Sequence, residues 1–481
     1  MSVARGVAGR WGRLGLALTP AIALASTPAV VCAGAAQGPG LAAGAPGTPP
    51  ASLEARPTAP ESSPLASRIP LANGLVLLVT ERHGLPIVTV KVDVAAGAVL
   101  DPPDRAGLAN LTALLLTRGT ATRTGWEMDR TIEFVGSSLE AEGGRDGSEL
   151  TLAVLKKDWS LGLDLLADAL RRPTFPTDEF LRKRDELRAS VRQGEEDPDE
   201  VASRLFRRLV FPADPYGRPV SGTEASLARI RRDDVTRFHA RAYRPERTIV
   251  AVVGDVTAEV ARRAITSRFG DWRVSGPRPE APPPIRAVSR ARTETISRDL
   301  AQATVLLGQA SIPRRHPDYY PLLVGAYVLG GGSSSRLYTR VREERGLAYS
   351  IDAELVAGAR GGLFVVEFQS RNARVKEVLG LVREELARLH RESVSPDELE
   401  RAKAYLVGSL PLRMDTNAEW ATLLLRVERL GLGLDYPLRY RRAVEAVTAA
   451  DVQRAVRARW DPARMSLAVV GNAWETGLGG S

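Results

Sequence analysis

The chain repeats part of its own sequence, and this repeat limits the folds that it can adopt. The segment DDVTRFHARAYRPERTIVAVVGDV is similar to ADVQRAVRARWDPARMSLAVVGNA, and the matched residues Asp234 and Asp451 lie 217 positions apart (451 − 234 = 217). The same offset pairs Tyr243 with Trp460 without a gap. An earlier pair, PTDEFLRKRDEL and VSPDELERAKAYL, follows the same order at nearly the same offset. Two ordered matches predict a duplicated domain.

Each repeat mixes strand and helix patterns. The valines from Val88 to Val94 alternate with polar residues, which is the period of a half-buried strand. DWSLGLDLLADALRR and RVKEVLGLVREELARLH are helical in pattern, and another helix is expected to begin after Ser395 as its N-cap, with Pro396 in the first position. The sequence therefore predicts an α+β fold of two homologous domains, each a mainly antiparallel sheet covered by helices on one face.

Shifts in composition set the expected boundaries. Residues 1–36 combine arginines, the short apolar run LGLALTPAIALA and a stretch of small residues, as a secretory signal peptide does. The Ala-, Gly- and Pro-rich stretch that follows is expected to be a disordered leader. The expected segments after the signal peptide are a leader over 37–66, a first domain over 67–273, a Pro-rich linker over 274–290, a second domain over 291–474 and a tail over 475–481.

The N-terminal segment predicts export to the periplasm or the extracellular space. Pro20 and Pro28 interrupt its apolar run and disfavour a stable membrane-spanning helix, although an N-terminal membrane anchor stays open as an alternative. Cys32, the single cysteine, allows a lipoprotein signal, but Val31 stands where such signals usually carry a small residue. If cleavage falls beyond Cys32, the mature chain has no thiol for a disulfide or a zinc site.

The net charge of +9 does not indicate a nucleic-acid-binding protein. Acidic and basic residues alternate along predicted helices, as in FLRKRDELRASVRQGEEDPDE, and the sequence has no basic run with interleaved aromatics. We therefore expect no nucleic-acid partner.

A leucine-rich helix is predicted within RAGLANLTALLLTRGT, from Arg105 to Thr120. Leu108, Leu111 and Leu115 have the spacing of a buried helix face, and Gly119 ends the pattern. Taken alone, this is a core helix. The histidines offer no local metal pair and are expected to be surface or core residues: His83, His239, His316 and His390.

The frame of this helix resembles that of the insulinase/pitrilysin-type zinc peptidases, in the branch of the mitochondrial processing peptidases. Gly107-Leu108-Ala109 and Gly119-Thr120 are similar to the residues that enclose the family's His-x-x-Glu-His motif. Further segments resemble family motifs between about Ser67 and Ala473: HARAYRPERTIVAVVGDV, DPYGRPVSGTEASLARI and LGGGSSSRLYTRVREERGLAYSI. The resemblance implies that the two domains form one half of a clamshell.

The same resemblance implies a degenerate zinc site. Asn110 and Leu114 stand at the two histidine positions, and Ala113 stands at the position of the general base. The third ligand of the family falls on Ser190 or its neighbours Ala189 and Val191, none of which is a carboxylate. We therefore expect this chain to bind no metal, and we expect zinc in a homologous partner subunit with an intact His-x-x-Glu-His motif.

The second repeat carries the residues expected to bind substrate. In the family, an Arg and a Tyr spaced like Arg342 and Tyr349 contact the peptide and stabilise the tetrahedral intermediate, as hydrogen-bond donors to a developing oxyanion can. The structural alternative is a surface arginine and a packed aromatic residue. In the first repeat, Glu140 to Gly143 replace the family's Asn-containing edge strand, which puts that substrate contact in doubt.

These features predict the non-catalytic, substrate-binding subunit of an exported heterodimeric zinc metallopeptidase that degrades or processes peptides. The chain is expected to be inactive alone. One alternative is a scaffold subunit with the same fold and no role in proteolysis, as in respiratory cytochrome complexes. Another is a self-contained peptidase with an unrecognised site.

Overall fold

The computed structural model describes residues 64–280, 285, 288 and 290–478. The predicted signal peptide, and the leader up to residue 63, lie outside the described residues. Within those ranges, no helix combines the length and the apolar character that crossing a membrane requires.

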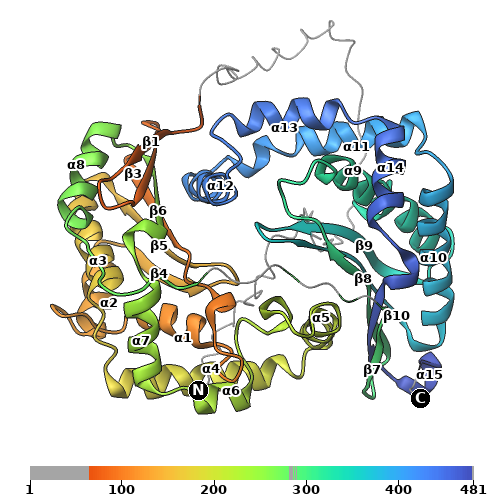
Figure 1. Ribbon diagram of the computed structural model, residues 1–481, viewed down its shortest axis with the longest axis horizontal. Coiled ribbons are helices and arrows are strands. Elements are labelled where there is room, and N and C mark those ends of the chain that lie inside the picture. The colour runs from red at the N-terminus through yellow and green to blue at the C-terminus, as the bar shows by residue number, and fades with distance from the viewer. Residues whose placement is uncertain (1–63, 281–284, 286–287, 289, 479–481) are drawn as a thin grey trace, which may run out of the picture. The chain divides into compact units, whose positions relative to one another are not determined.

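The first sheet has six strands in the order β1-β2-β6-β3-β5-β4. Figure 1 labels most of these strands at the left of the view. All neighbouring strands are antiparallel except β2 and β6, which are parallel. The strands are β1 (Ser67–Pro70), β2 (Val76–Glu81), β3 (Ile87–Val94), β4 (Ser138–Gly143), β5 (Ser148–Leu155) and β6 (Thr248–Gly254). The helices of this half are α1 (Leu108–Leu115), α2 (Gly125–Phe134), α3 (Trp159–Arg171), α4 (Thr177–Gly194), α5 (Pro198–Val210), α6 (Glu224–Arg229), α7 (Arg232–Ala242) and α8 (Ala258–Phe269).

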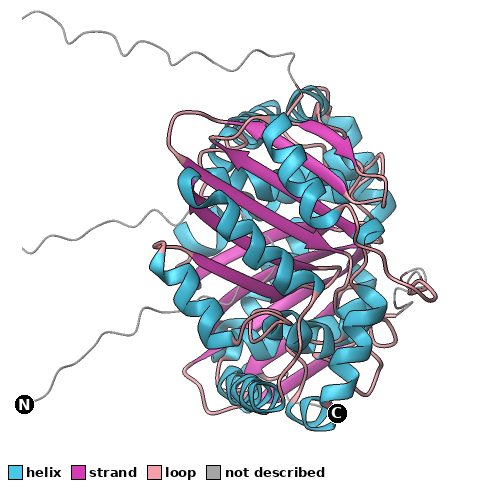
Figure 2. Ribbon diagram, turned by 90° about the vertical axis from the view of Figure 1, so that its left-hand side faces the viewer, coloured by secondary structure: helices cyan, strands magenta, loops and turns pink. Residues whose placement is uncertain are grey.

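The second sheet has five strands in the order β7-β11-β8-β10-β9, and only β7 and β11 are parallel neighbours. The strands are β7 (Thr293–Ser297), β8 (Gln302–Ser311), β9 (Ala348–Ala357), β10 (Gly362–Arg371) and β11 (Ser466–Gly471). The helices are α9 (Tyr319–Gly330), α10 (Val375–Arg391), α11 (Pro396–Gly408), α12 (Asn417–Arg429), α13 (Tyr436–Glu445), α14 (Ala449–Arg459) and α15 (Ala473–Thr476). Both halves contain strands and helices, which Figure 2 colours separately, and the predicted α+β fold is confirmed.

The sequence repeat appears in the structure as a repeat of elements. Helix α7 and strand β6 recur as α14 and β11, so that the matched residues Tyr243 and Trp460 both directly follow a helix. Both side chains are buried. The predicted helix start at Ser395 is also confirmed, because its side chain accepts a hydrogen bond from the backbone N–H of Glu398 at 3.3 Å. The two halves are therefore copies of one α+β unit.

Most helices of each half pack against one face of the sheet of that half, and each half forms a large apolar core there. One helix from each half packs instead on the opposite face of the other sheet. Leu205 of α5 joins a cluster with Leu306 and Val365 of the second sheet, and Leu424 of α12 joins a cluster with Leu78 and Val253 of the first. The two halves are therefore linked by an exchange of helices.

This exchange corrects one expectation from the sequence. Strand β3 was predicted to be half-buried, but Thr89, Lys91 and Asp93 are buried together with the alternating valines. The prediction was wrong because α12, which lies more than 300 positions along the sequence, contacts the polar face of the strand. Arg429 of α12 forms an ion pair with Asp93 there.

Candidate functional site

Helix α1 is the leucine-rich helix predicted from the sequence, and Asp101 anchors its first turn. The carboxylate oxygens accept hydrogen bonds from the backbone N–H groups of Gly107 (2.9 Å) and Ala109 (2.8 Å). Burial raises the pKa of Asp101 to about 7, while these two N–H donors act in the opposite direction. Gly107 has a φ of +97°, and a Cβ there would lie 2.9 Å from a methyl group of Leu227. The glycine of the Gly-Leu-Ala frame is therefore required by the fold.

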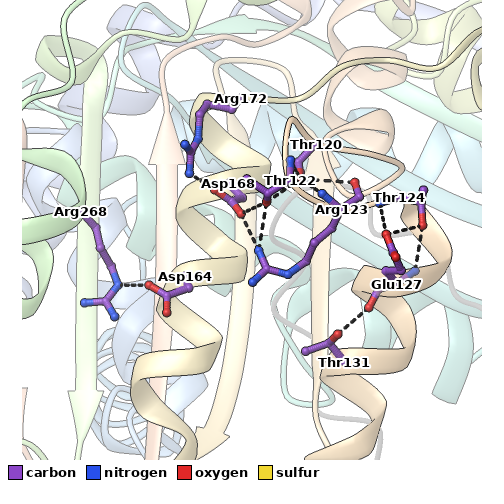
Figure 3. Close-up of polar contacts among 10 residues, drawn as sticks. All are labelled: Thr120, Thr122, Arg123, Thr124, Glu127, Thr131, Asp164, Asp168, Arg172 and Arg268. Carbon is purple, nitrogen blue, oxygen red and sulfur yellow. Dashed lines mark hydrogen bonds and ion pairs between the residues drawn. The ribbon is translucent and has the colours of Figure 1, made fainter.

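The Gly119-Thr120 end of the frame is also structural. The Thr120 hydroxyl oxygen accepts a hydrogen bond from the backbone N–H of Arg123 at 3.1 Å. The carboxylate of Asp168, in α3, accepts hydrogen bonds from the side chains of Thr122 (2.5 Å) and Arg123 (2.6 Å), as Figure 3 shows. Both ends of the frame therefore fix α1 against its neighbours through contacts that need no metal.

Asn110, Ala113 and Leu114, the positions that resemble the ligand and base positions of the family's motif, all lie on α1. Asn110 and Leu114 are partly buried, whereas Ala113 is fully buried. The side-chain oxygen of Asn110 accepts a hydrogen bond from the backbone N–H of Gly143, the last residue of edge strand β4, at 3.2 Å. At this point Asn110 joins the helix to the strand.

The position of the third ligand is equally unsuited to zinc. On α4, Ala189 and Ser190 are exposed, whereas Val191 is buried in the core that also contains Leu111 and Leu115. In the described part of the chain, no three His, Cys, Asp or Glu side chains are grouped as the ligands of a metal ion would be. The structure therefore brings no carboxylate or imidazole to the ligand positions of α1.

The histidines lie in four separate environments. His239 is buried between Phe175 and Tyr243, and burial lowers its pKa to about 4. His83 is exposed, and its hydrogen bonds to Asp255 and then Glu81 raise its pKa. Burial lowers the pKa of His390, and Nδ1 of His316 accepts a hydrogen bond from the backbone of Asp318.

The close packing of helix α1 against strand β4 can be tested by a substitution at Gly143. A Cβ on Gly143 would lie 2.3 Å from the Cα of Asn110, closer than real carbon atoms approach. We expect Gly143→Ala to lower the free energy of unfolding by about 1–3 kcal/mol, because strand and helix must separate. Urea denaturation measures the change. Gly84→Ala is the matched control, since a Cβ added there would have no other atom within 4 Å, and an equal loss in both variants would contradict the contact.

The structure brings Arg342 and Tyr349 together. Arg342 belongs to a π-helical turn over Tyr338–Glu343, a rare element that is frequent at functional sites, and Tyr349 lies at the start of β9. The guanidinium carbon of Arg342 is 4.9 Å from the ring centres of both Tyr338 and Tyr349. Tyr349 is 76% exposed, although large apolar and aromatic side chains are mostly buried in this chain. The pair therefore presents a guanidinium and a phenol to the surroundings.

Neighbouring arginines of the same motif have a different role. Arg336 forms an ion pair with Glu398 (2.6 Å), and Arg340 forms one with Glu385 (2.7 Å). Both carboxylates belong to helices that pack behind the motif. Among the described residues, Arg342 has no carboxylate within ion-pair distance, so its contacts are the two tyrosine rings. Arg336 and Arg340 hold the motif in place, and Arg342 keeps its donors available.

Tyr338 was missed by reasoning from the sequence. It precedes Arg342 by four positions, which is the spacing that places two side chains on the same face of a helix. That spacing could have identified it. Its ring makes a cation–π contact with the same guanidinium that Tyr349 contacts.

Strand β9 is an edge strand of the second sheet, as β4 is of the first, and it carries acidic side chains. Burial, and then repulsion by Glu367 of β10, raises the pKa of Glu354 to about 7. Burial, and then repulsion by Asp199 and Asp352, raises the pKa of Glu367 to about 7. Asp199 of α5 accepts a hydrogen bond from the side chain of Gln369 at 2.7 Å. Four carboxylates thus lie near one another beside the first turn of α5.

These pKa values predict a pH dependence of stability. Folding raises the pKa of each of these two carboxyl groups from 4.5 to about 7, so between these pH values the folded state holds more protons than the unfolded state. The free energy of unfolding therefore falls as the pH rises through this window. We expect the double variant Glu354→Gln, Glu367→Gln to lose less stability than the parent between pH 5 and pH 8. Urea midpoints at the two pH values measure this. Glu344→Gln is the exposed control, and parallel pH curves for the parent and the double variant would contradict the assignment.

The duplicated α+β unit, together with a helix that has the frame of a zinc-peptidase motif without its ligands, defines a peptidase-like protein. Comparison with known families agrees: residues 76–224 match the model described as insulinase (peptidase family M16), and residues 229–406 match the model described as peptidase M16 inactive domain. The chain belongs to the insulinase family, peptidase family M16. The resemblance seen in the sequence is confirmed.

Individual relatives cover most of the chain. An uncharacterized zinc protease of Mycobacterium tuberculosis is 30% identical over 404 residues, which are 83% of this chain and 92% of the relative. A non-peptidase homolog of Helicobacter pylori is 24% identical over 397 residues, which are 82% of this chain and 90% of that protein. A crystal structure described as a peptidase M16 inactive domain from Pseudomonas fluorescens superimposes with a TM-score of 0.77 at 25% identity, covering 84% of this chain and 98% of that one.

Proposed function

We propose that this chain is the non-catalytic, substrate-binding subunit of an exported heterodimeric zinc metallopeptidase that degrades or processes peptides. The observation that carries the proposal is the contrast between two parts of the same fold. Helix α1 has no metal ligand at its three motif positions, whereas Arg342 contacts two tyrosines and has no ion-pair partner among the described residues. Helix α1 thus carries no residue suited to bind zinc at these positions, whereas the second half presents a guanidinium and a phenol that could bind a peptide.

Arg342 and Tyr349 have the chemistry that peptide cleavage needs from a second subunit. When a peptide carbonyl is attacked, its oxygen becomes negatively charged, and a guanidinium and a phenol can both donate hydrogen bonds to it. The homologous partner would supply the zinc and its bound water. In this chain, Tyr349 lies at the start of the edge strand β9, so an extended peptide could add to that edge as a further strand.

The experiment is to purify this chain and a zinc-bearing family member encoded in the same genome, and to test both on a short quenched fluorescent peptide. We expect each chain alone to give little cleavage, the mixture to cleave rapidly, and a chelator to abolish that activity. Size-exclusion chromatography of the mixture should show a complex of the two chains. The signal peptide is tested by sequencing the N-terminus of the protein recovered from the periplasmic fraction.

The main alternative is a scaffold subunit of the same fold. A scaffold would form a complex without changing the cleavage rate of the partner. If the mixed chains associate but cleave no faster than the partner alone, the scaffold function is correct. If this chain cleaves peptides by itself and loses that activity with chelator, it is a self-contained peptidase.

A further inference from the structure

A basic cavity lies in the second half of the chain, and neither α1 nor the pair of Arg342 and Tyr349 contributes to its lining. It has a volume of about 530 Å³ and is formed by the segment between β8 and α9, the turn after α12, and helix α13. The residues that matter here are four arginines, a histidine and a tyrosine: Arg314, Arg315, His316, Tyr436, Arg439 and Arg442.

Arg314 is a buried residue in the wall of this cavity. Only 2% of its surface is exposed, and its guanidinium carbon lies 3.5 Å from the ring centre of Tyr319. Its Nη2 donates a hydrogen bond to the hydroxyl of Tyr436 at 3.0 Å, but its Nε has no hydrogen-bond partner in the described structure. A buried guanidinium N–H without an acceptor costs free energy, and Arg314 therefore leaves an incompletely compensated positive charge in the wall of the cavity.

The charges around Arg314 are unbalanced. Arg439 pairs with Asp435 at 2.9 Å, whereas Arg315 and Arg442 have no carboxylate within ion-pair distance among the described residues. Of the residues that the structure describes, no Asp or Glu lines the cavity. The carboxylate of Asp318 lies 3.7 Å from His316, but it also pairs with two arginines of α14. Three guanidinium groups therefore line one cavity without a counter-charge in that part of the chain.

We propose that this cavity binds a small phosphate-bearing anion. One guanidinium group can donate two parallel hydrogen bonds to two oxygens of a phosphate. Several arginines around one cavity therefore suit a ligand with two or more negative charges. The volume lies in the range of small-molecule sites, and the wall formed by Tyr320 and Tyr436 can contact a flat organic part of such a ligand. Neither Arg342 nor Tyr349 lines this cavity, so the proposed anion site is distinct from the proposed peptide site.

Calorimetric titration of the full chain with pyrophosphate tests the proposal. We expect saturable binding of one pyrophosphate per chain, with Arg442→Gln and Arg315→Gln each weakening it about tenfold, as the loss of one charge-assisted hydrogen bond does. Both arginines line the cavity without a side-chain hydrogen bond or ion pair to the described residues, so their loss should leave the fold intact. Arg383→Gln, an exposed arginine of α10 outside the cavity, is the matched control and should bind like the parent.

Further titrations identify the source of the phosphate. ADP binding at least as tightly as pyrophosphate would assign the site to nucleotides, and tighter binding of pyrophosphate would assign it to inorganic phosphates. Either result supports the proposal. Equal binding of citrate and pyrophosphate, no saturable binding of any phosphate, or equal weakening in Arg383→Gln and Arg442→Gln would overturn it.

Discussion

Replacing Arg342 by alanine is expected to lower the cleavage rate of the mixed chains about a hundredfold, the usual effect of removing one donor to a developing oxyanion. Arg342 lies 4.9 Å from the rings of Tyr338 and Tyr349 and has no ion pair to lose among the described residues. The variant should therefore fold and associate with the partner normally. Steady-state kinetics on a short peptide measure the change, which should fall mainly on kcat because the interaction forms in the transition state.

Arg345→Ala is the matched control for this variant. Arg345 lies three positions further along the same motif, but it is exposed and faces Glu377 at 3.6 Å instead of the two tyrosines. Its replacement should leave the cleavage rate within about twofold of the parent, as expected of an exposed ion pair. A cleavage rate that is the same in Arg342→Ala and Arg345→Ala would remove Arg342 from the substrate site.

Replacing Arg429 by methionine is expected to lower the free energy of unfolding by about 3–5 kcal/mol, because it leaves a buried carboxylate unpaired. Arg429 of α12 pairs with Asp93 of β3, which is 2% exposed, so this contact joins the exchanged helix to the first sheet. Urea denaturation, monitored by circular dichroism, measures the change. The unfolding midpoint should fall while the slope stays constant, provided that the two halves still unfold together.

A double variant separates the unpaired charge from the lost packing. Adding Asp93→Asn to Arg429→Met removes the buried negative charge, and we expect it to restore at least half of the lost stability. If Arg429→Met alone unfolds within about 0.5 kcal/mol of the parent, as an ordinary surface substitution does, α12 is not held by this ion pair.

Local patterns in the sequence predicted much of this fold. The repeat at a constant offset predicted two copies of one unit, and α7 and α14 occupy matching places in the two halves. The leucine spacing predicted a buried helix at α1, and the Ser-Pro start predicted α11. The two helix predictions depend on residues that are close together in the sequence, so their periodicity and capping are visible without the structure. The repeat is visible because the sequence can be compared with itself.

Contacts between distant segments could not be predicted in the same way. Nothing in the sequence of β3 shows that α12 covers its polar face, and Asp93 therefore looked exposed. The partners of the motif arginines lie on α10 and α11, so only the structure separates the paired Arg340 from Arg342. The cavity around Arg314 is built from three separate segments, and no local motif marks it.

The proposed function requires that helix α1 binds no zinc and that Arg342 and Tyr349 contact the substrate of a zinc-bearing partner. The most direct test is the metal content of the purified chain after incubation with zinc and removal of the excess, measured by mass spectrometry of the metal. We expect less than about 0.1 zinc per chain, because no His or carboxylate occupies the ligand positions of α1. The zinc-bearing partner should retain about one zinc per chain under the same treatment. About one tightly bound zinc in this chain, lost together with peptide cleavage on chelation, would contradict the account.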